Sequence, residues 1–232
     1  MENSYDSYKS TATSSVLSTV MRKVYVRMFL ALVVTAFTAL YVASSPALLT
    51  TILGSRAIFF GLMIAELAVV FVLSGMLHKL STATATLLFY LYAILNGVVF
   101  SSIFVVYELG SIAYTFFITA GVFGAMSVYG LVTKNDMTRF GRYCVMALFG
   151  LIIATVVNIF VASSTLDWII SFVGVALFIG LTAWDTQKIK NAAYEVEPSQ
   201  MGKLATIGAL SLYLDFINLF LYLLRFFGRS ND

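Results

Sequence analysis

The chain contains little charge. Only 11% of its 232 residues are Asp, Glu, Lys or Arg, whereas 60% are hydrophobic, and its mean hydropathy is +0.95. This balance excludes an ordinary soluble domain. The single cysteine, Cys144, excludes an internal disulfide and a paired-cysteine metal or redox site. The formal net charge is only +3, and the basic residues form no continuous stripe, so we expect no nucleic-acid partner.

Long apolar runs dominate the rest of the sequence and are separated by short polar segments. A helical span needs about 20 residues, so the chain has room for roughly seven spans and no sizeable soluble domain. Each span must satisfy its own backbone in lipid, which requires helices, and no alternating barrel pattern is present. We predict an all-α integral membrane protein with seven transmembrane helices. They are expected at 28–43, 57–77, 85–106, 112–132, 143–162, 168–184 and 204–227.

The predicted domain organisation is simple. Residues 1–26 are polar and rich in Ser and Thr, which predicts a flexible N-terminal tail. The first apolar run comes too late for a cleavable signal and leads into further spans, so we expect an uncleaved first helix. Residues 27–228 are predicted to form a single seven-helix transmembrane domain, and 229–232 a short C-terminal tail. One long connection is predicted, at 186–203.

The distribution of basic residues predicts the orientation in the membrane. If the N-terminus is cytoplasmic, the cytoplasmic loops hold most Lys and Arg residues, and the outer loops hold only Arg56. Arg225 and Arg229 break this rule, because seven full crossings place them outside. Two alternatives remain open. The last segment, about 24 apolar residues long, either crosses fully or dips in and returns, which keeps the C-terminus inside.

Two carboxylates in the last two apolar segments are the strongest functional signal. Asp215 lies near the middle of the seventh segment and Asp185 at the end of the sixth. A charge at membrane depth costs roughly 2.5–3.5 kcal/mol even on lenient insertion scales, so such residues normally face a cavity or a partner. Asp215 is expected to lie deeper than Asp185. The two meet only if the seventh helix begins outside the bilayer, near Met201.

Each aspartate also has a structural interpretation: Asp215 as a residue that bonds a neighbouring hydroxyl, and Asp185 as an interfacial group paired with a nearby lysine. If the two carboxylates meet, they cannot both ionise cheaply, so they share a proton and titrate as one unit. When both are ionised, the pair offers the oxygen ligands that Ca²⁺ prefers. Asn218 shares a helix face with Asp215 and is a candidate pore-lining residue. Glu66, in the second span, either lines the same cavity or bonds a neighbouring helix.

Two motifs carry a family resemblance. Residues 180–189 (GLTAWDTQKI) and 209–225 (ALSLYLDFINLFLYLLR) closely resemble the C-terminal motifs of the Bax inhibitor-1 (transmembrane Bax-inhibitor-motif) family, and the short loops resemble its bacterial branch. The resemblance implies two groups of three helices around a central seventh helix, and a pH-sensitive Ca²⁺ leak. It further implies that Asp185 and Asp215 share a hydrogen bond near the cytosolic side and that Glu66 matches the carboxylate of the second helix. The family's basic closed-state lock has only His78 and Lys79 as candidates here.

Two functions follow as hypotheses. The first is a passive Ca²⁺ leak channel, gated by the proton shared between Asp185 and Asp215, without a cofactor. The second is a non-transporting regulator that binds a membrane protease or other membrane proteins. An intramembrane aspartyl protease is disfavoured because neither aspartate follows a Gly-x-Gly pattern, so we expect no enzyme. The expected surroundings are the lipid bilayer of a bacterial inner membrane, Ca²⁺ and protons.

Overall fold

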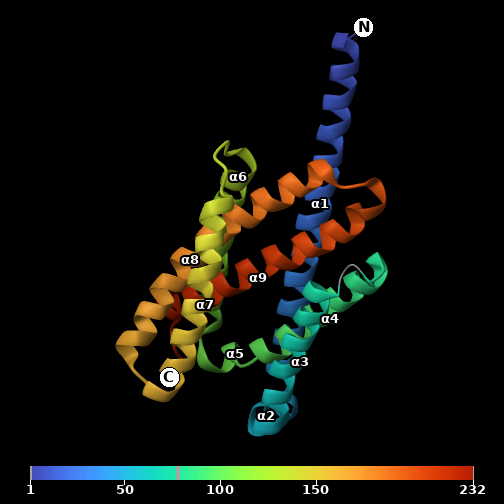
Figure 1. The fold of residues 1–232 in the computed structure, drawn as a ribbon. Helices are drawn as coiled ribbons and strands as arrows, with labels where there is room; N and C mark the ends of the chain where they lie inside the picture. The colour runs from blue at the N-terminus through green and yellow to red at the C-terminus, as the bar shows by residue number, and fades with distance from the viewer. Residues whose placement is uncertain (1, 77–78, 232) are drawn as a thin grey trace. The chain divides into compact units, whose positions relative to one another are not determined.

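The structure is a computed structural model that describes residues 2–76 and 79–231, with side chains from residue 15 onward. Within these residues, seven helices are long and apolar enough to cross a membrane, and none of the residues belongs to a named strand. Figure 1 shows the helices and the short connections between them. The prediction of an all-α integral membrane protein with seven spans is therefore confirmed.

The helices are α1 (Glu2–Ala43), α2 (Pro46–Gly54), α3 (Arg56–Gly75), α4 (Thr82–Phe100), α5 (Ile103–Val106), α6 (Leu109–Val132), α7 (Thr138–Val161), α8 (Ser164–Glu195) and α9 (Met201–Phe227), with a 3₁₀ turn at Pro198–Gln200. The chain forms two compact units. Unit 1 comprises Met1–Val106 and Ile189–Leu210, and unit 2 comprises Tyr107–Lys188 and Ser211–Asp232. Unit 1 contains the spans α1, α3 and α4, unit 2 contains α6, α7 and most of α8, and α9 contributes to both.

Three helices of unit 1, α2, α3 and α4, begin directly after a serine. Ser45 caps α2 and is followed by Pro46 at the first helical position. Ser55 caps α3 and Ser81 caps α4, and each side chain accepts a hydrogen bond from a backbone amide three residues later. Serine at this position satisfies one of the amides that a helix start leaves free, and proline is tolerated there because it has no amide hydrogen to satisfy.

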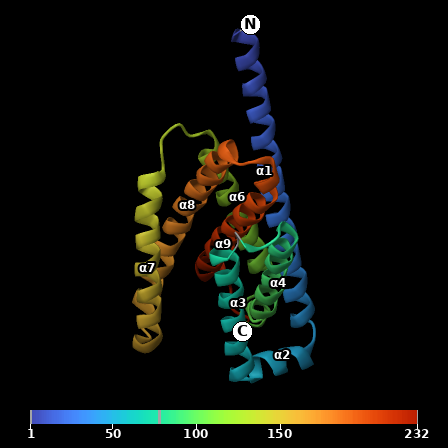
Figure 2. The same cartoon turned by 45° about the vertical axis from the view of Figure 1, so that its right-hand side comes forward.

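A close helix contact organises unit 1. Helices α1 and α4 lie side by side (Figures 1 and 2). Gly97 permits the approach, because a Cβ there would lie 2.7 Å from the carbonyl oxygen of Thr35. The Thr35 hydroxyl donates a hydrogen bond to the Ala93 carbonyl at 2.9 Å. Small residues and interhelical hydrogen bonds drive helix association in lipid, where apolar surface alone gives no preference for protein over lipid.

Helix α1 also holds the beginning of α9 within unit 1. The Arg27 guanidinium donates a hydrogen bond to the Gly202 carbonyl at 2.6 Å and another to the hydroxyl of Thr206. Thr206 in turn shares a hydrogen bond with Thr86 of α4 at 3.1 Å. Three helices therefore meet at the first turns of α9 through a charged donor and two hydroxyl groups.

Unit 2 is packed through rings and glycines. Helices α7 and α8 lie side by side (Figure 2). They approach closely because Gly141 lacks a side chain where the Trp184 ring lies: a Cβ there would be 2.1 Å from that ring. Helix α9 packs on α6 through Phe216, whose ring makes edge-to-face contacts with Phe116 and Phe123 at centroid distances of 5.3 and 5.4 Å. Such aromatic pairs add to the energy of apolar burial.

The end of α9 is bonded to the beginnings of α6 and α8. Arg225 Nη1 lies 2.6 Å from Asp167 Oδ1 at the start of α8. Beyond the helix, the Glu108 amide donates to the Arg229 carbonyl at 2.8 Å, and the Arg229 amide donates to the Ser111 hydroxyl at 3.0 Å. Helix α9 is unbroken over Met201–Phe227 and is long and apolar enough to cross a membrane, which favours the alternative of a full crossing for the last segment.

Two boundaries differ from the sequence prediction. The prediction of a long connection at 186–203 is wrong, because α8 continues to Glu195. The continuation buries Ile189 and Ala193 in unit 1 and meets no helix breaker before Pro198. At the other end of the chain, α1 is helical from Glu2 and buries Val20 fully, so packing begins before the predicted start of the helical domain at residue 27.

Candidate functional site

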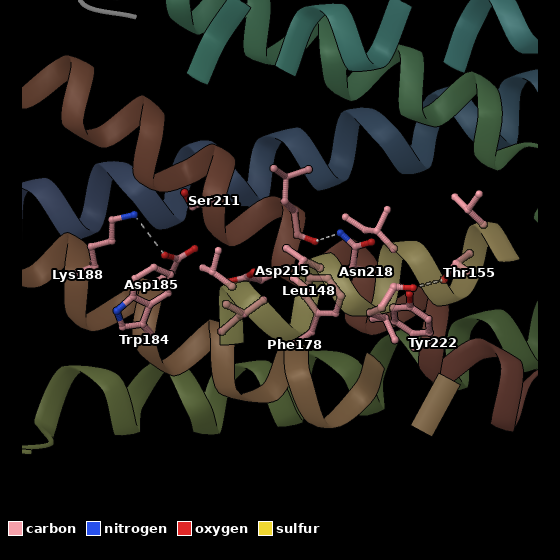
Figure 3. A pocket seen from close by; sticks show the side chains of 16 residues that line it. Leu148, Thr155, Phe178, Trp184, Asp185, Lys188, Ser211, Asp215, Asn218 and Tyr222 are labelled. Atoms are coloured by element: carbon pink, nitrogen blue, oxygen red, sulfur yellow. Dashed lines mark hydrogen bonds and ion pairs between the residues drawn. The ribbon is translucent and has the colours of Figure 1, made fainter. Parts of the chain in front are cut away.

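A cavity of about 560 Å³ lies within unit 2, between the side chains of α7, α8 and α9. Most of its lining is apolar. Its polar groups are Thr155, Trp184, Asp185, Lys188, Ser211, Asp215, Asn218 and Tyr222. Figure 3 shows that the charged groups gather on the side where α8 contributes Trp184, Asp185 and Lys188. The cavity is thus an apolar pocket with a few convergent polar side chains, which is the usual form of a binding site.

The structure brings the two predicted aspartates to this one cavity. Asp215 is 4% exposed, and its Oδ2 has no hydrogen-bond partner. Asp185 is more open, with 13% of its side chain exposed. Both carboxylates line the same cavity. The sequence argument required α9 to begin near Met201 for the two to meet, and α9 does begin there.

Lys188 and Trp184 complete the charged side of the cavity. Lys188 Nζ lies 3.9 Å from Asp185 Oδ1 and 4.8 Å from the centroid of the Trp184 ring. The lysine follows Asp185 by three residues, so both lie on the same face of α8. Among the described residues that line the cavity, Lys188 carries the single positive charge. The structure therefore shows the pairing with a nearby lysine that was one of the two interpretations of Asp185, at the same cavity that Asp215 lines.

Gln187 is a site-supporting residue that the sequence did not indicate. It is buried, and its Oε1 accepts a hydrogen bond from the Met137 amide at 2.9 Å. Its Nε2 donates to the Asn135 carbonyl at 2.8 Å. The side chain therefore ties the α6–α7 connection to α8, two residues beyond Asp185. Successive helix residues are about 100° apart, so Gln187 and Asp185 leave α8 on nearly opposite sides.

The other candidate residues fall in different places. Asn218 lines the cavity, as predicted, and donates to the Leu214 carbonyl of its own helix at 2.8 Å. Glu66 lies on α3 in unit 1 and is not part of the cavity lining; its Oε1 is buried without a hydrogen-bond partner. Lys79 is exposed and is likewise not among the lining residues. His78, the other candidate for the closed-state lock, lies outside the described residues.

The oxygen donors at the cavity set a limit on cation binding. Ca²⁺ takes six to eight oxygen ligands at about 2.3–2.6 Å. In the part of the chain that the structure describes, no group of three or more His, Cys, Asp or Glu side chains could hold a metal ion. The cavity offers the carboxylates of Asp185 and Asp215, which are fewer protein ligands than a permanently bound Ca²⁺ ion takes.

Fold and site together define a class: a multi-pass, seven-helix membrane protein with a carboxylate-containing cavity among its last helices. Residues 17–232 match the family described as "Inhibitor of apoptosis-promoting Bax1", and the chain belongs to this family, the Bax inhibitor-1 family. The resemblance of the two C-terminal motifs is thereby confirmed.

Bacterial relatives cover nearly the whole chain. The chain is 49% identical over 216 residues to "Inner membrane protein YbhL" of Escherichia coli (strain K12), and the match covers 92% of each chain. An uncharacterized protein of Borreliella burgdorferi is 44% identical over 215 residues, covering 91% of this chain and 93% of the relative. A third, of Deinococcus radiodurans, is 43% identical over 215 residues, covering 92% and 91%.

Proposed function

We propose that this chain is a passive Ca²⁺ leak channel, gated by a proton that Asp185 and Asp215 share. The observation that carries the proposal is the placement of both carboxylates, one of them almost fully buried, in the same cavity between α8 and α9. Family membership is consistent with it. The mechanism makes and breaks no covalent bond, so we propose that the protein is not an enzyme and needs no cofactor.

The direction of the pH dependence follows from the charges. At low pH the shared proton lets one carboxyl donate to the other, which holds α9 against α8 and closes the path. As the pH rises the proton leaves, and two negative charges at short range in a poorly solvated cavity repel each other. The repulsion separates the pair and exposes oxygen ligands to the incoming cation. Ca²⁺ flux is therefore expected to increase with pH.

Asp215→Asn tests this mechanism directly. The amide cannot ionise and so cannot share a titrating proton, and we expect Ca²⁺ flux to lose its pH dependence. The measurement is Ca²⁺ entry into proteoliposomes over a series of pH values from about 5 to about 8, because a proton shared by a pair leaves in a step that belongs to both groups. Asp185→Asn should behave alike, because the proton belongs to the pair.

Asp136→Asn is the matched control, since it removes one carboxylate from the same unit at a position that does not line the cavity. Its pH profile should equal that of the wild type. An unchanged profile in Asp215→Asn would rule out the shared-proton gate. Absence of flux in all proteins, together with a stable membrane-protein partner on purification, would favour the alternative of a non-transporting regulator.

For the cellular location we propose a bacterial inner membrane with a cytoplasmic N-terminus. A relative that is 49% identical is named an inner membrane protein, and the loop charges favour this orientation. Seven crossings then put the C-terminus outside, where the charge of Arg225 is offset by Asp167. A C-terminal alkaline phosphatase fusion should be active and a C-terminal green fluorescent protein fusion dark. The reverse result would refute the orientation.

A further inference from the structure

Lys188 lies beside the carboxylate that a cation at Asp185 would bind. Its ammonium group lies 3.9 Å from Asp185 Oδ1, and it lines the same cavity as Asp215. Figure 3 shows the lysine side chain directed at the Asp185 carboxylate, with the Trp184 ring on the same side of the cavity. A cation that binds the two carboxylates must therefore meet or displace this ammonium group.

The lysine is held at the site and can still leave it. The Trp184 ring lies 4.8 Å from Nζ, within the range in which an aromatic face attracts an ammonium group. The lysine side chain is nevertheless 61% exposed, so water can solvate the group when it moves aside. An ion pair this exposed is weak, and its exchange with a free cation is correspondingly easy.

We propose that Lys188 is a tethered counter-ion that competes with the permeating divalent cation for Asp185 and keeps its affinity low. The inference rests on the proposed function and adds a residue that sets the affinity of the cavity for the divalent cation. Lys188 neutralises one of the two negative charges when the site is empty and returns to Asp185 when the cation leaves. Conduction needs such a balance, because a cation that binds too tightly does not leave the path.

Lys188→Met tests the proposal, because it removes the charge and keeps most of the side-chain length. Exposed ion pairs are worth up to about 1 kcal/mol, so the half-saturating Ca²⁺ concentration should fall about two- to fivefold. Maximal flux should stay equal or fall, since release becomes slower. Lys188→Arg keeps the charge and should shift the half-saturating concentration less than Met does.

Lys134→Met is the matched control. Lys134 is exposed, lies in the α6–α7 connection of the same unit and does not line the cavity, so its loss changes the net charge equally. We expect its half-saturating concentration to equal that of the wild type. If the half-saturating Ca²⁺ concentration shifted equally in this control and in Lys188→Met, the proposal would be overturned. The shift would then come from the net charge of the protein and not from competition at Asp185.

A binding measurement separates this proposal from the channel function. The chain has two tryptophans, so in a Trp168→Phe background Trp184, which lines the cavity, reports Ca²⁺ titrations of the detergent-solubilised protein. A lower binding midpoint in Lys188→Met, even without flux in any protein, supports the counter-ion and refutes the channel. Flux with an unchanged midpoint overturns the counter-ion alone. No Ca²⁺-dependent signal and no flux overturns both.

Discussion

Gln187 provides a quantitative test of how the α6–α7 connection holds α8 in place. Its side chain accepts from the Met137 amide at 2.9 Å and donates to the Asn135 carbonyl at 2.8 Å. In Gln187→Ala both bonds are lost. The Asn135 residue is exposed, so water can solvate its carbonyl. The Met137 amide is buried, and leaving a buried donor unsatisfied costs about 1–3 kcal/mol.

That cost should appear as local opening of α7 from α8. Cys144 of α7 is a buried free thiol, and it lies near Gly180 of α8, where an added Cβ would be 3.4 Å from Cys144 Sγ. A thiol reagent can modify it only when the two helices separate. If Gln187→Ala destabilises the closed arrangement by about 1–3 kcal/mol, the open population rises roughly 5- to 150-fold.

The assay is the rate of maleimide labelling in detergent or nanodiscs, under conditions in which opening and closing are faster than labelling. The chain has one cysteine, so every labelled molecule reports this position. Gln200→Ala, which makes the same change at an exposed position of the Pro198–Gln200 turn, should leave the rate unchanged. Equal labelling rates for Gln187→Ala and the wild type would show that the two hydrogen bonds do not restrain α8.

Three further outcomes are expected in unit 2. Gly141→Leu places a side chain where the Trp184 ring lies, and such overpacking should lower stability by about 1–3 kcal/mol or more, measured by thermal unfolding in detergent; a stability equal to wild type would contradict the contact. Arg225→Met removes an exposed ion pair and should cost only about 0.2–1 kcal/mol, decreasing with added salt; a salt-independent cost would point to lost packing instead. Hydrogen bonds from Thr138, first its hydroxyl and then its amide, hold the pKa of Asp136 below its usual 3.8. They therefore stabilise the fold above that pH and lose their effect as the pH falls through the lowered pKa. Thr138→Val should raise that pKa towards 3.8 in a carboxyl ¹³C NMR titration, and an unchanged value would refute the assignment to the hydroxyl.

The spans, and the two aspartates as candidate site residues, could be predicted from the sequence because their signals are local. Seven apolar runs of sufficient length have no alternative to helices in lipid, and a carboxylate within such a run stands out by its cost. Asp185 and Asp215 therefore stand out in the sequence itself, without knowledge of their neighbours in the fold. Their common cavity was not derivable from the residues alone, since it depends on where α9 begins.

The sequence does not predict the end of α8 or the role of Gln187, because tertiary packing determines both. Lys188 and Glu195 made the segment after Asp185 appear to be a loop, whereas one face of that segment, with Ile189 and Ala193, is buried and extends α8. A window of hydropathy averages the two faces and misses this. Gln187 is hidden for a related reason. Its partners lie about fifty residues earlier and are backbone groups, so no residue type in the sequence marks them.

Arg225, one of the two basic residues that do not fit the proposed orientation, has two partners in unit 2. It is bonded to Asp167 and lies 5.7 Å from the Tyr222 ring centroid. The orientation rule counts basic residues near the ends of spans and gives acidic residues little weight, so these partners do not remove the exception. The same contacts join the end of α9 to the start of α8. If they persist while the proposed gate separates the two aspartates, the motion is a bending or rotation of α9 near Asp215. A disulfide or other crosslink between the start of α8 and the end of α9 is then expected to leave pH-dependent flux intact, whereas a crosslink beside Asp215 is expected to abolish it.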